Sequence, residues 1–551
     1  MNPEPNPATP LKSRRSLLPI LFSVGIFAGL LALFVVASQQ MFPRNALAVA
    51  AQQEENGDEP QLKPAPELEG GIAWLNTSGP LTLKDLKGKI VVLDFWTYCC
   101  INCIHTLPDL AKLEKKYANQ VVVIGVHSAK FDTEKDSGNI REAILRYEIS
   151  HPVVNDAEMK IWNNYGVRSW PTLAVIDPEG NYLGQASGEG NLELLERVID
   201  GQIKKHRAKK TLNEKPMRFD LIRFREKKDS PLFFPGKVLA DEASKRLFIA
   251  DSTNHRIVIT DLDGNKQAII GGNGPGLKDG SFAEAQFEDP QGMALKGDTL
   301  YIADRRNHCI RAADLVKGTV TRIAGTGEQN RDRLLGGEGK SVGLNSPWDL
   351  LVKGDTLFIA MAGHHQIWTM DLAKGTVQNY AGDGRENIKD GPLYASRFAQ
   401  PSGLTTDGTN LYVADCEVSA IRKLPMDGKG RVETLIGQGL FEFGDIDGVG
   451  DDARLQHALA VAYHDGLIYV ADTYNSKLKT IDPKTRTLAT FIKSEGKDPA
   501  FNEPAGLSYA AGKLYVADTN AHRIRVVDLK TKAVSTLALK GVSLPVEPKA
   551  E

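Results

Sequence analysis

The second half of the chain contains six related segments, and no other feature constrains the fold as strongly. They begin 46 to 57 residues apart: LFIADSTNHRIVITD (247–261), LYIADRRNHCIRAAD (300–314), LFIAMAGHHQIWTMD (357–371), LYVADCEVSAIRKLP (411–425), IYVADTYNSKLKTID (468–482) and LYVADTNAHRIRVVD (514–528). Repeats of about 40 to 50 residues with four short strands each are typical of β-propeller blades. Because a single blade cannot bury both of its faces, we predict that six blades close into a ring over residues 230–541.

Polar residues recur at matching positions of these segments. They are Asp251, Asp304, Asp415, Asp472 and Asp518, with His255, His308, His365 and His522. Such residues suit hydrogen bonds to turn backbones, so we expect them to join turns within and between blades. Met361, Ser419 and Ser476 interrupt the pattern, which argues against a ring of metal ligands. RFDLIRF (218–224) precedes the repeats and is a candidate strand for closing the ring.

Length and charge place this ring within a larger protein. The chain has 551 residues, more than one ordinary core can use, and a formal net charge of −2. Nucleic-acid binders usually carry a clear basic excess, so we expect no nucleic-acid partner. Five cysteines in so long a chain do not make a disulfide scaffold, yet three of them fall within WTYCCINC (96–103).

The N-terminus contains a long apolar run, LLPILFSVGIFAGLLALFVVA (17–37). At 1.5 Å per residue it would extend about 31 Å as a helix, enough to cross a bilayer. Basic residues precede it and acidic residues follow it, which favours a cytoplasmic N-terminus. We therefore expect a single-pass anchor in residues 1–44 of an inner or plasma membrane, with a flexible tether at 45–66 and the remaining domains periplasmic. An export signal cleaved after Ala48 or Ala50 stays open as the alternative.

Between the tether and the repeats, strands and helices alternate. The predicted strands are short, apolar and β-branched, and they lie at 90–93, 121–126 and 173–176. Leucines at helical spacing follow WTYCCINC within 106–119. A strand, a CxxC motif, a helix and further strands predict one α/β layer over residues 67–205. A linker at 206–229 joins it to the ring, and a tail follows at 542–551.

The segment LDFWTYCCINC (93–103) is similar to the active-site segment of the thioredoxin family. The resemblance implies that Cys100 is the nucleophile, Cys103 the resolving thiol and Asp94 a buried proton acceptor. It further implies that Pro171, in WPTL (170–173), is a cis proline facing the cysteines. Trp96 and Trp170 are then the candidate substrate-binding residues.

Elementary chemistry fits these roles. A thiolate is the reactive form of cysteine, and free N–H groups at a helix N-terminus stabilise an anion at the position of Cys100. Cys100 would form a mixed disulfide with a substrate, and Cys103 would then displace the substrate while its proton passes to Asp94. Zinc would need a second pair of soft ligands, which the sequence does not offer, so we expect no metal and no other cofactor.

Two positions depart from the thioredoxin pattern. Ile101-Asn102 stand between the cysteines in place of Gly-Pro, and Cys99 occupies the place of a tryptophan. For Cys99, an apolar, partly buried role and an accessory redox role both stay open. His105 lies off the helical face of Cys103, so we expect it at the surface.

The motif YVAD-x-x-N-H-R-I resembles the NHL repeat, and the two domains together resemble the thioredoxin-like, NHL-repeat-containing protein family, here a membrane-anchored bacterial-type member. The predicted fold class is multidomain: an N-terminal transmembrane helix, an α/β thioredoxin-like domain and an all-β six-bladed NHL-type propeller. The expected function is an extracytoplasmic thiol–disulfide oxidoreductase acting on a protein disulfide or dithiol, with the propeller binding a protein partner. A redox-inert interaction protein is the alternative, and a propeller-borne hydrolase or lyase is a third.

Overall fold

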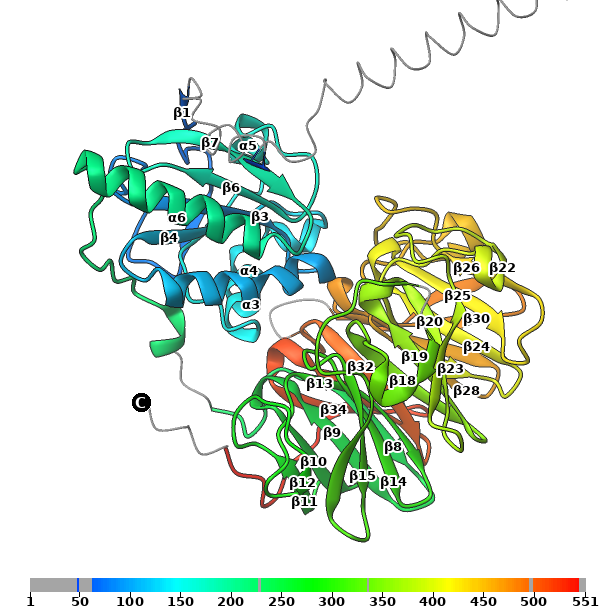
Figure 1. The fold of residues 1–551 in the computed structure, drawn as a ribbon. Coiled ribbons are helices and arrows are strands. Elements are labelled where there is room, and N and C mark those ends of the chain that lie inside the picture. The colour runs from blue at the N-terminus through cyan, green and yellow to red at the C-terminus, as the bar shows by residue number, and fades with distance from the viewer. Residues whose placement is uncertain (1–46, 49–61, 226–228, 334–335, 495–498, 545–551) are drawn as a thin grey trace, which may run out of the picture.

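A computed structural model describes residues 47–48, 62–225, 229–333, 336–494 and 499–544. The described chain forms a seven-stranded α/β domain and six further sheets that make a propeller. Figure 1 shows the α/β domain, in blue to teal, lying beside the propeller, in green to red. The predicted thioredoxin-like domain and six-bladed propeller are therefore confirmed.

The α/β domain is built on one mixed sheet with the strand order β1-β7-β6-β3-β4-β5-β2. Its strands are β1 Lys63–Pro64, β2 Ala73–Leu75, β3 Ile90–Trp96, β4 Val121–His127, β5 Val153–Asn155, β6 Thr172–Ile176 and β7 Asn181–Ser187. The central strands β3 and β4 are parallel and wholly buried, as their continuous apolar runs predict.

Helices cover both faces of this sheet: α3 Ile101–Lys116, α4 Ser137–Arg146, α5 Lys160–Asn164 and α6 Leu192–Lys209. Apolar side chains of α3, α4 and α6 share one core cluster with alternate residues of β3, such as Val92 and Trp96. Residues of α5 join the cluster on the opposite face, with Phe95. The helix α3, which begins directly after Cys100, therefore lies over the face of β3 that carries Asp94.

Each propeller blade is a four-stranded antiparallel meander. The blades are β8 Pro235–Asp241, β9 Arg246–Asp251, β10 Arg256–Asp261 and β11 Lys266–Gly271; β13 Pro290–Lys296, β14 Thr299–Asp304, β15 Cys309–Asp314 and β16 Thr319–Ala324; β18 Pro347–Lys353, β19 Thr356–Met361, β20 Gln366–Asp371 and β21 Thr376–Ala381; β23 Pro401–Thr406, β24 Asn410–Asp415, β25 Ala420–Pro425 and β26 Arg431–Ile436; β28 Ala460–His464, β29 Leu467–Asp472, β30 Lys477–Asp482 and β31 Thr487–Ile492; and β32 Pro504–Ala510, β33 Lys513–Asp518, β34 Arg523–Asp528 and β35 Val534–Thr536.

Four blades gain a short outer strand from the preceding connection. These strands are β12 Gly280–Ser281, β17 Gly336–Glu338, β22 Gly391–Pro392 and β27 Gly448–Val449. The ring closes where the end of the last blade meets the first, because the N–H of Lys266 donates to Lys540 and the N–H of Lys540 donates to Gly264.

The repeated aspartates bind turns, as expected. Each accepts a hydrogen bond from a backbone N–H sixteen or eighteen residues earlier in the chain, at 2.6–2.8 Å: Asp251 from Phe233, Asp304 from Glu288, Asp415 from Ala399, Asp472 from Gln456 and Asp518 from Asn502. Buried cations pair with the second oxygens of several of them, for example Arg311 with Asp304 at 2.9 Å. The aspartates therefore fix the connection that precedes the inner strand in the five blades that carry them; the third blade has Met361 at this position.

The repeated histidines join neighbouring blades. The Nδ1 atoms of His255, His308, His365 and His522 accept hydrogen bonds from the N–H groups of Asp289, Ser346, Gln400 and Phe234. Where serine replaces histidine, Ser419 and Ser476 accept the same bond through Oγ, from His457 and Glu503. The interruption of the motif thus preserves the contact, and the predicted role between blades is confirmed.

Two predictions on the chain's outer segments need correction. Among the residues that the structure describes, no helix combines the length and apolar character needed to cross a membrane, and the expected anchor at 17–37 lies outside those residues. The transmembrane helix is therefore withdrawn from the fold class. RFDLIRF forms no propeller strand either: it contains a short 3-10 turn, Ile222–Phe224, and Ile222 packs into the core of the α/β domain.

Candidate functional site

Cys100 and Cys103 lie at the N-terminal end of α3. Cys100 is the N-cap residue, with an extended backbone (φ −78°, ψ 118°), and its side chain caps no helix N–H group. Cys103 lies one turn further along and is fully buried, whereas Cys100 is 8% exposed. Burial, then Cys100, then Asp94 raise the pKa of Cys103 well above its usual range. Cys103 therefore needs a proton acceptor before it can act as a nucleophile.

Asp94, the predicted acceptor, lies close enough to Cys103 to raise the pKa of that thiol. It lies on β3, it is fully buried, and neither carboxylate oxygen has a hydrogen-bond partner among the described residues. Burial raises its pKa to about 7, against a smaller lowering by His151. A carboxyl group that titrates near neutrality beneath a buried thiol is suited to exchange a proton with it.

Pro171 lies where β6 begins, and its peptide bond with Trp170 is cis. Trp170 is half-buried, and its Nε1 donates to the carbonyl of Ser128 at 2.9 Å. Trp96, expected to bind substrate, is instead fully buried and has no exposed surface to offer. Its Nε1 points toward Gly125 of β4, where a Cβ atom would lie 2.9 Å away.

Glu134 holds the loop before the cysteines in place. This fully buried residue of the turn Asp132–Lys135 accepts hydrogen bonds from Thr97 Oγ1 at 2.6 Å and from the Cys99 N–H at 2.9 Å. It also accepts from the N–H groups of Lys130 and Phe131. Burial raises the pKa of Glu134, and its hydrogen bonds oppose that shift. This role could not be predicted, because Glu134 belongs to no sequence motif.

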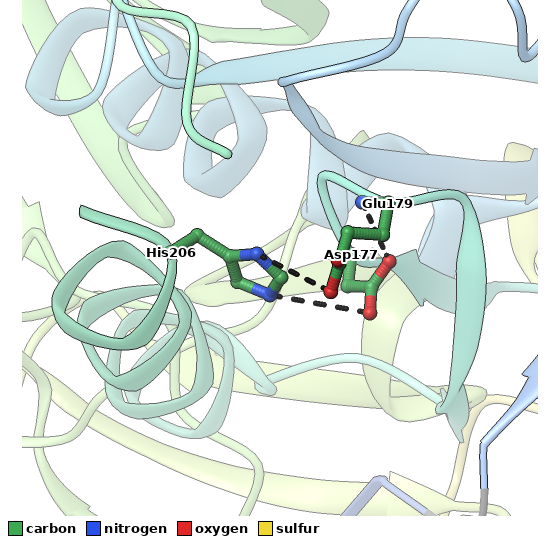
Figure 2. A group of neighbouring side chains, drawn as sticks. All are labelled: Asp177, Glu179 and His206. Carbon is green, nitrogen blue, oxygen red and sulfur yellow. Dashed lines mark hydrogen bonds and ion pairs between the residues drawn. The ribbon is translucent and has the colours of Figure 1, made fainter. Parts of the chain in front are cut away.

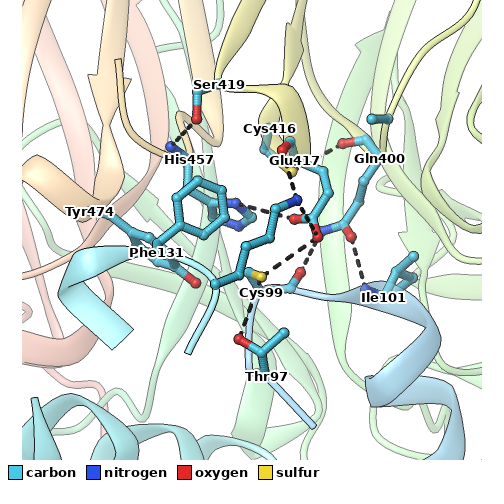
Figure 3. A network of polar contacts seen from close by, with 12 residues as sticks. Thr97, Cys99, Ile101, Phe131, Gln400, Cys416, Glu417, Ser419, His457 and Tyr474 are labelled. Carbon is cyan, nitrogen blue, oxygen red and sulfur yellow. Dashed lines mark hydrogen bonds and ion pairs between the residues drawn. The ribbon is translucent and has the colours of Figure 1, made fainter. Parts of the chain in front are cut away.

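The propeller covers the cysteine segment (Figure 3). The side-chain amide of Gln400 accepts from the N–H of Ile101 at 2.8 Å and donates to the carbonyl of Cys99 at 2.9 Å. The two bonds bracket Cys100 from the propeller side. We call this part of the propeller the roof of the dithiol. It consists of Gln400, Glu417 and the apolar residues that surround Ile101, which the next paragraph names.

Ile101 fills an apolar socket in the roof. It is 1% exposed and clusters with Trp348, Ala362, Cys416, Leu459 and Ala505, which come from four different blades. The inner strands of all blades contact one another around the propeller axis, so this socket lies at the axial end of the ring. The departure from Gly-Pro at this position is thus explained by an interdomain contact.

Cys99 belongs to the same interface. It is 2% exposed, and its Sγ lies 3.7 Å from Thr97 Oγ1 and 3.6 Å from Glu417 Oε1 of the propeller. Lys130 Nζ pairs with Glu417 at 3.1 Å, and both side chains are almost fully buried. Burial and the nearby carboxylates of Glu134 and Glu417 raise the pKa of Cys99 well above its usual range. This environment favours the thiol form.

His105 also contacts the propeller, which corrects its expected surface position. One ring nitrogen lies 2.7 Å from Glu189 and the other 2.7 Å from Ser346 Oγ. Gln329 donates to Glu189 at 3.0 Å, and Arg331 pairs with Glu189 at 3.2 Å. Although burial opposes it, these partners hold the pKa of Glu189 at about 2. The interface therefore includes charged contacts beside α3 as well as the roof.

One group of side chains has metal-ligand types, away from the dithiol. The ligand atoms of Asp177, Glu179 and His206 lie within 4.8 Å of one another (Figure 2). Both ring nitrogens of His206 already have partners, Thr211 Oγ1 at 2.7 Å and Gln202 Oε1 at 3.2 Å, and Asp177 accepts from the N–H of Asn181. These bonds explain the cluster as packing, and we assign it no metal.

Comparison with known proteins supports both domains. Residues 88–182 match the thioredoxin-like family, and residues 287–312 and 501–527 match the NHL repeat. The chain is 28% identical over 139 residues to thiol-disulfide oxidoreductase YkuV of Bacillus subtilis, which covers 25% of this chain and 93% of that protein. This likeness is confined to the thioredoxin-like domain.

Two relatives match both domains. NHL repeat-containing protein 2 of Homo sapiens is 41% identical over 516 residues, 86% of this chain and 70% of that protein. Protein SUPPRESSOR OF QUENCHING 1, chloroplastic, of Arabidopsis thaliana is 44% identical over 442 residues, 77% of this chain and 42% of that protein.

These findings correct the expected location. Relatives that match most of the chain are eukaryotic NHL repeat-containing proteins and a chloroplastic protein, and no described helix can cross a membrane. The predicted membrane-anchored bacterial type, with a single pass through an inner membrane and periplasmic domains, is therefore not supported. Shared domain order and identity over most of the length place this chain in the NHL repeat-containing protein 2 family.

Proposed function

We propose that the chain is a thiol–disulfide oxidoreductase of thioredoxin type, whose propeller covers the dithiol and binds a protein partner. The observation that carries the proposal is the position of Cys100 and Cys103 at the N-terminal end of α3, with the buried Asp94 of β3 close enough to raise the pKa of Cys103. A nucleophile at the helix end, a resolving thiol one turn on and an unpartnered carboxyl group beneath them are the parts that the reaction requires.

The reaction balances on these residues alone. The Cys100 thiolate attacks one sulfur of a substrate disulfide, so that a Cys100–substrate bond forms and the substrate bond breaks. Cys103 gives its proton to Asp94 and attacks Cys100, which releases the second substrate thiol and leaves a Cys100–Cys103 disulfide. Two electrons pass to the substrate, and the reverse sequence oxidises a dithiol.

Access to Cys100 requires the roof to move. The two bonds of Gln400 and the burial of Ile101 leave Cys100 only 8% exposed. A protein disulfide must bring its sulfur in line with Cys100 Sγ, so we infer that substrate binding separates the roof from the cysteine segment. This assigns the propeller a part in substrate selection.

The same observation favours a second candidate, a redox-inert interaction protein in which the thioredoxin-like domain only presents the propeller. The two candidates differ in one outcome. With Cys103→Ser, an oxidoreductase accumulates a mixed disulfide on Cys100, because the resolving thiol is missing.

The test uses the full chain with a fluorescent disulfide-bonded peptide as probe. We expect a covalent adduct on Cys100 of the Cys103→Ser protein that dithiothreitol releases, and none when Cys100 is also serine. Cys99→Ser combined with Cys103→Ser is the matched control and should give the same adduct yield as Cys103→Ser alone. If no adduct forms on Cys100 and the wild-type protein does not reduce the probe, the oxidoreductase proposal fails and the interaction protein stands.

A further inference from the structure

Several buried polar side chains on the α3 side of the sheet have atoms without partners among the described residues, His127 included, and three of these side chains lie around Gly125. They are Asp94, through both oxygens, Trp96, through Nε1, and His151, through Nε2. Asp94 and Trp96 are fully buried, and His151 is 3% exposed. Buried polar atoms are almost always hydrogen-bonded to protein or water, so three such groups together call for a common explanation.

All three groups converge beside Gly125. Asp94 is the register partner of Gly125 in the parallel pair of β3 and β4, so their side-chain directions share one face. A Cβ atom on Gly125 would lie 2.9 Å from Trp96 Nε1 and 3.5 Å from His151 Nε2. Val153 Cγ2 would lie 3.2 Å from the same Cβ atom, so a side chain at position 125 would crowd these groups, and glycine leaves them facing one another. A water molecule held between the unpartnered atoms of Asp94, Trp96 and His151 would give each of them a hydrogen bond.

His151 also reaches toward solvent. Its Nδ1 lies 3.4 Å from Glu114 Oε2, and the Glu114 side chain on α3 is 25% exposed. Asn76 fixes the backbone next to it, because its Nδ2 donates to the carbonyls of Ile149 and His151, both at 2.9 Å. His151 thus spans the distance between the buried carboxyl group and an exposed one.

We propose that His151 and Glu114 conduct to solvent the proton that Asp94 takes from Cys103, through a water bound beside Gly125. This inference rests on the proposed function. As the Cys100–Cys103 bond forms, the Cys103 proton moves to Asp94 and then through the water to His151 Nε2. His151 gives its Nδ1 proton to Glu114, which exchanges with solvent. Reduction of the disulfide returns a proton along the same route and restores the original tautomer.

Few titratable groups lie beside the proposed proton route from Cys103 to Glu114. Cys103 and His151 face Asp94, Cys100 faces Cys103, and Glu114 and Asp94 face His151. His127 packs edge-on against Trp96, with 5.0 Å between ring centroids, and burial lowers its pKa to about 3. His127 therefore stays neutral wherever the enzyme operates and adds no charge.

The experiment uses stopped flow to follow the reaction of the reduced full chain with the aromatic disulfide DTNB, which releases two aromatic thiolates from each DTNB molecule. The first release reports attack by Cys100, and the second reports resolution by Cys103. We expect His151→Gln and Glu114→Gln to slow the second release by about tenfold near pH 7 and to leave the first unchanged. His151→Gln should add no further loss to Asp94→Asn, since the residues act in series.

Asp109→Asn is the matched control, because Asp109 is another α3 carboxylate that pairs with Lys112 and does not reach His151. Glu114→Gln changes a partly exposed side chain, so it tests the route even if His151→Gln folds poorly. A second release within about twofold of wild type in both variants, with Asp94→Asn slow, would overturn the relay and leave the oxidoreductase intact. Absence of the second release in the wild-type protein would overturn both.

Discussion

The propeller and the dithiol site both bury carboxyl groups, but they surround them differently. Asp304 in the ring accepts from the Glu288 N–H at 2.8 Å and pairs with Arg311 at 2.9 Å. Asp94 has no partner for either oxygen among the described residues. Burial raises the pKa of both, to about 6 for Asp304 and about 7 for Asp94. Burial therefore does not distinguish the two carboxyl groups, whereas their hydrogen-bond partners do.

The same contrast holds between repeated and unrepeated residues. Residues that recur in the ring have their hydrogen bonds satisfied by neighbouring turns, as His365 does with Gln400. Residues that depart from their family's pattern, Ile101 and Cys99, contact the other domain instead. In the ring, repeated residues and the serines that replace them have structural roles, whereas the departures of the cysteine segment from the thioredoxin pattern lie at the contact between the domains.

The largest expected effect is on stability, at Asp304. Asp304→Ala removes the buried carboxylate that pairs with Arg311, which keeps only the half-exposed Asp279, and it leaves the Glu288 N–H without its acceptor; together these losses cost about 3–5 kcal/mol. In a domain of this size that lowers the melting temperature of the propeller by roughly 5–15 °C, as measured by scanning calorimetry. Asp371→Ala, at an exposed turn, is the control and should change it little. Equal small shifts in both variants would contradict the assignment of Asp304 to the framework.

Asp94→Asn should, in contrast to Asp304→Ala, reduce activity and increase stability. We expect the disulfide reductase rate to fall about 100-fold near pH 7, because the acceptor for Cys103 is lost. The folded pKa of Asp94, about 7, exceeds its unfolded value, so in the wild-type protein its stabilising contribution is present below about pH 4 and is lost as the pH rises through 7. The Asp94→Asn variant should therefore be more stable than the wild-type protein at the pH values where Asp94 is ionised.

The calorimetric readout for Asp94→Asn is the melting temperature of the thioredoxin-like domain at pH 5 and pH 8. The variant should gain more over the wild-type protein at pH 8 than at pH 5. A gain that does not depend on pH, or an unchanged rate, would show that Asp94 is a packing residue like those of the ring.

A smaller effect is expected at the roof. Gln400→Ala removes both bonds that bracket Cys100, so alkylation of Cys100 by iodoacetamide should become about tenfold faster, as each bond contributes on the order of 1 kcal/mol. Gln378→Ala, on the outer strand β21, serves as control. If alkylation is as slow in Gln400→Ala as in the wild-type protein, the propeller does not gate the dithiol.

The smallest effect on stability is expected at His522, where the two residue types that join blades, histidine and serine, can be compared. His522→Ala should cost about 1–2 kcal/mol, since it leaves the Phe234 N–H without an acceptor between the last and first blades. His522→Ser should recover part of that loss, because serine accepts the equivalent bond at Ser419 and Ser476. Denaturant unfolding monitored by circular dichroism measures both, and equal losses would show that the ring packing of His522 matters more than its hydrogen bond.

Local pattern was enough to predict much of the fold. The spacing of the YVAD segments predicts six blades, and the alternation around WTYCCINC predicts the α/β domain with Cys100 at a helix start. The prediction that RFDLIRF forms a propeller strand was wrong, because an apolar alternation over seven residues is compatible both with a strand and with a packed turn. The apolar run at 17–37 led to a membrane anchor that the comparisons and the described helices do not support.

The residues that surround the dithiol could not be predicted from local sequence patterns. Gln400 and Glu417 contact the cysteine segment across about 300 residues of sequence, and nothing in their own segments distinguishes them from other turn residues. Glu134 and His151 lie between secondary-structure elements, where single polar residues carry no periodic signal. The packing of the propeller on the thioredoxin-like domain brings Gln400 and Glu417 to the cysteine segment, whereas the tertiary fold of the thioredoxin-like domain itself brings Glu134 to Cys99 and His151 to Asp94.

The proposed function requires Cys100 and Cys103 to form a reversible redox pair. A redox titration of the full chain in glutathione buffers, with trapping by acid and mass spectrometry of alkylated peptides, tests it directly. We expect one two-electron transition that converts Cys100 and Cys103 together into an intramolecular disulfide, while Cys99 remains alkylatable after unfolding. If no Cys100–Cys103 disulfide forms at any glutathione ratio, or if Cys99 is oxidised in its place, the account is contradicted.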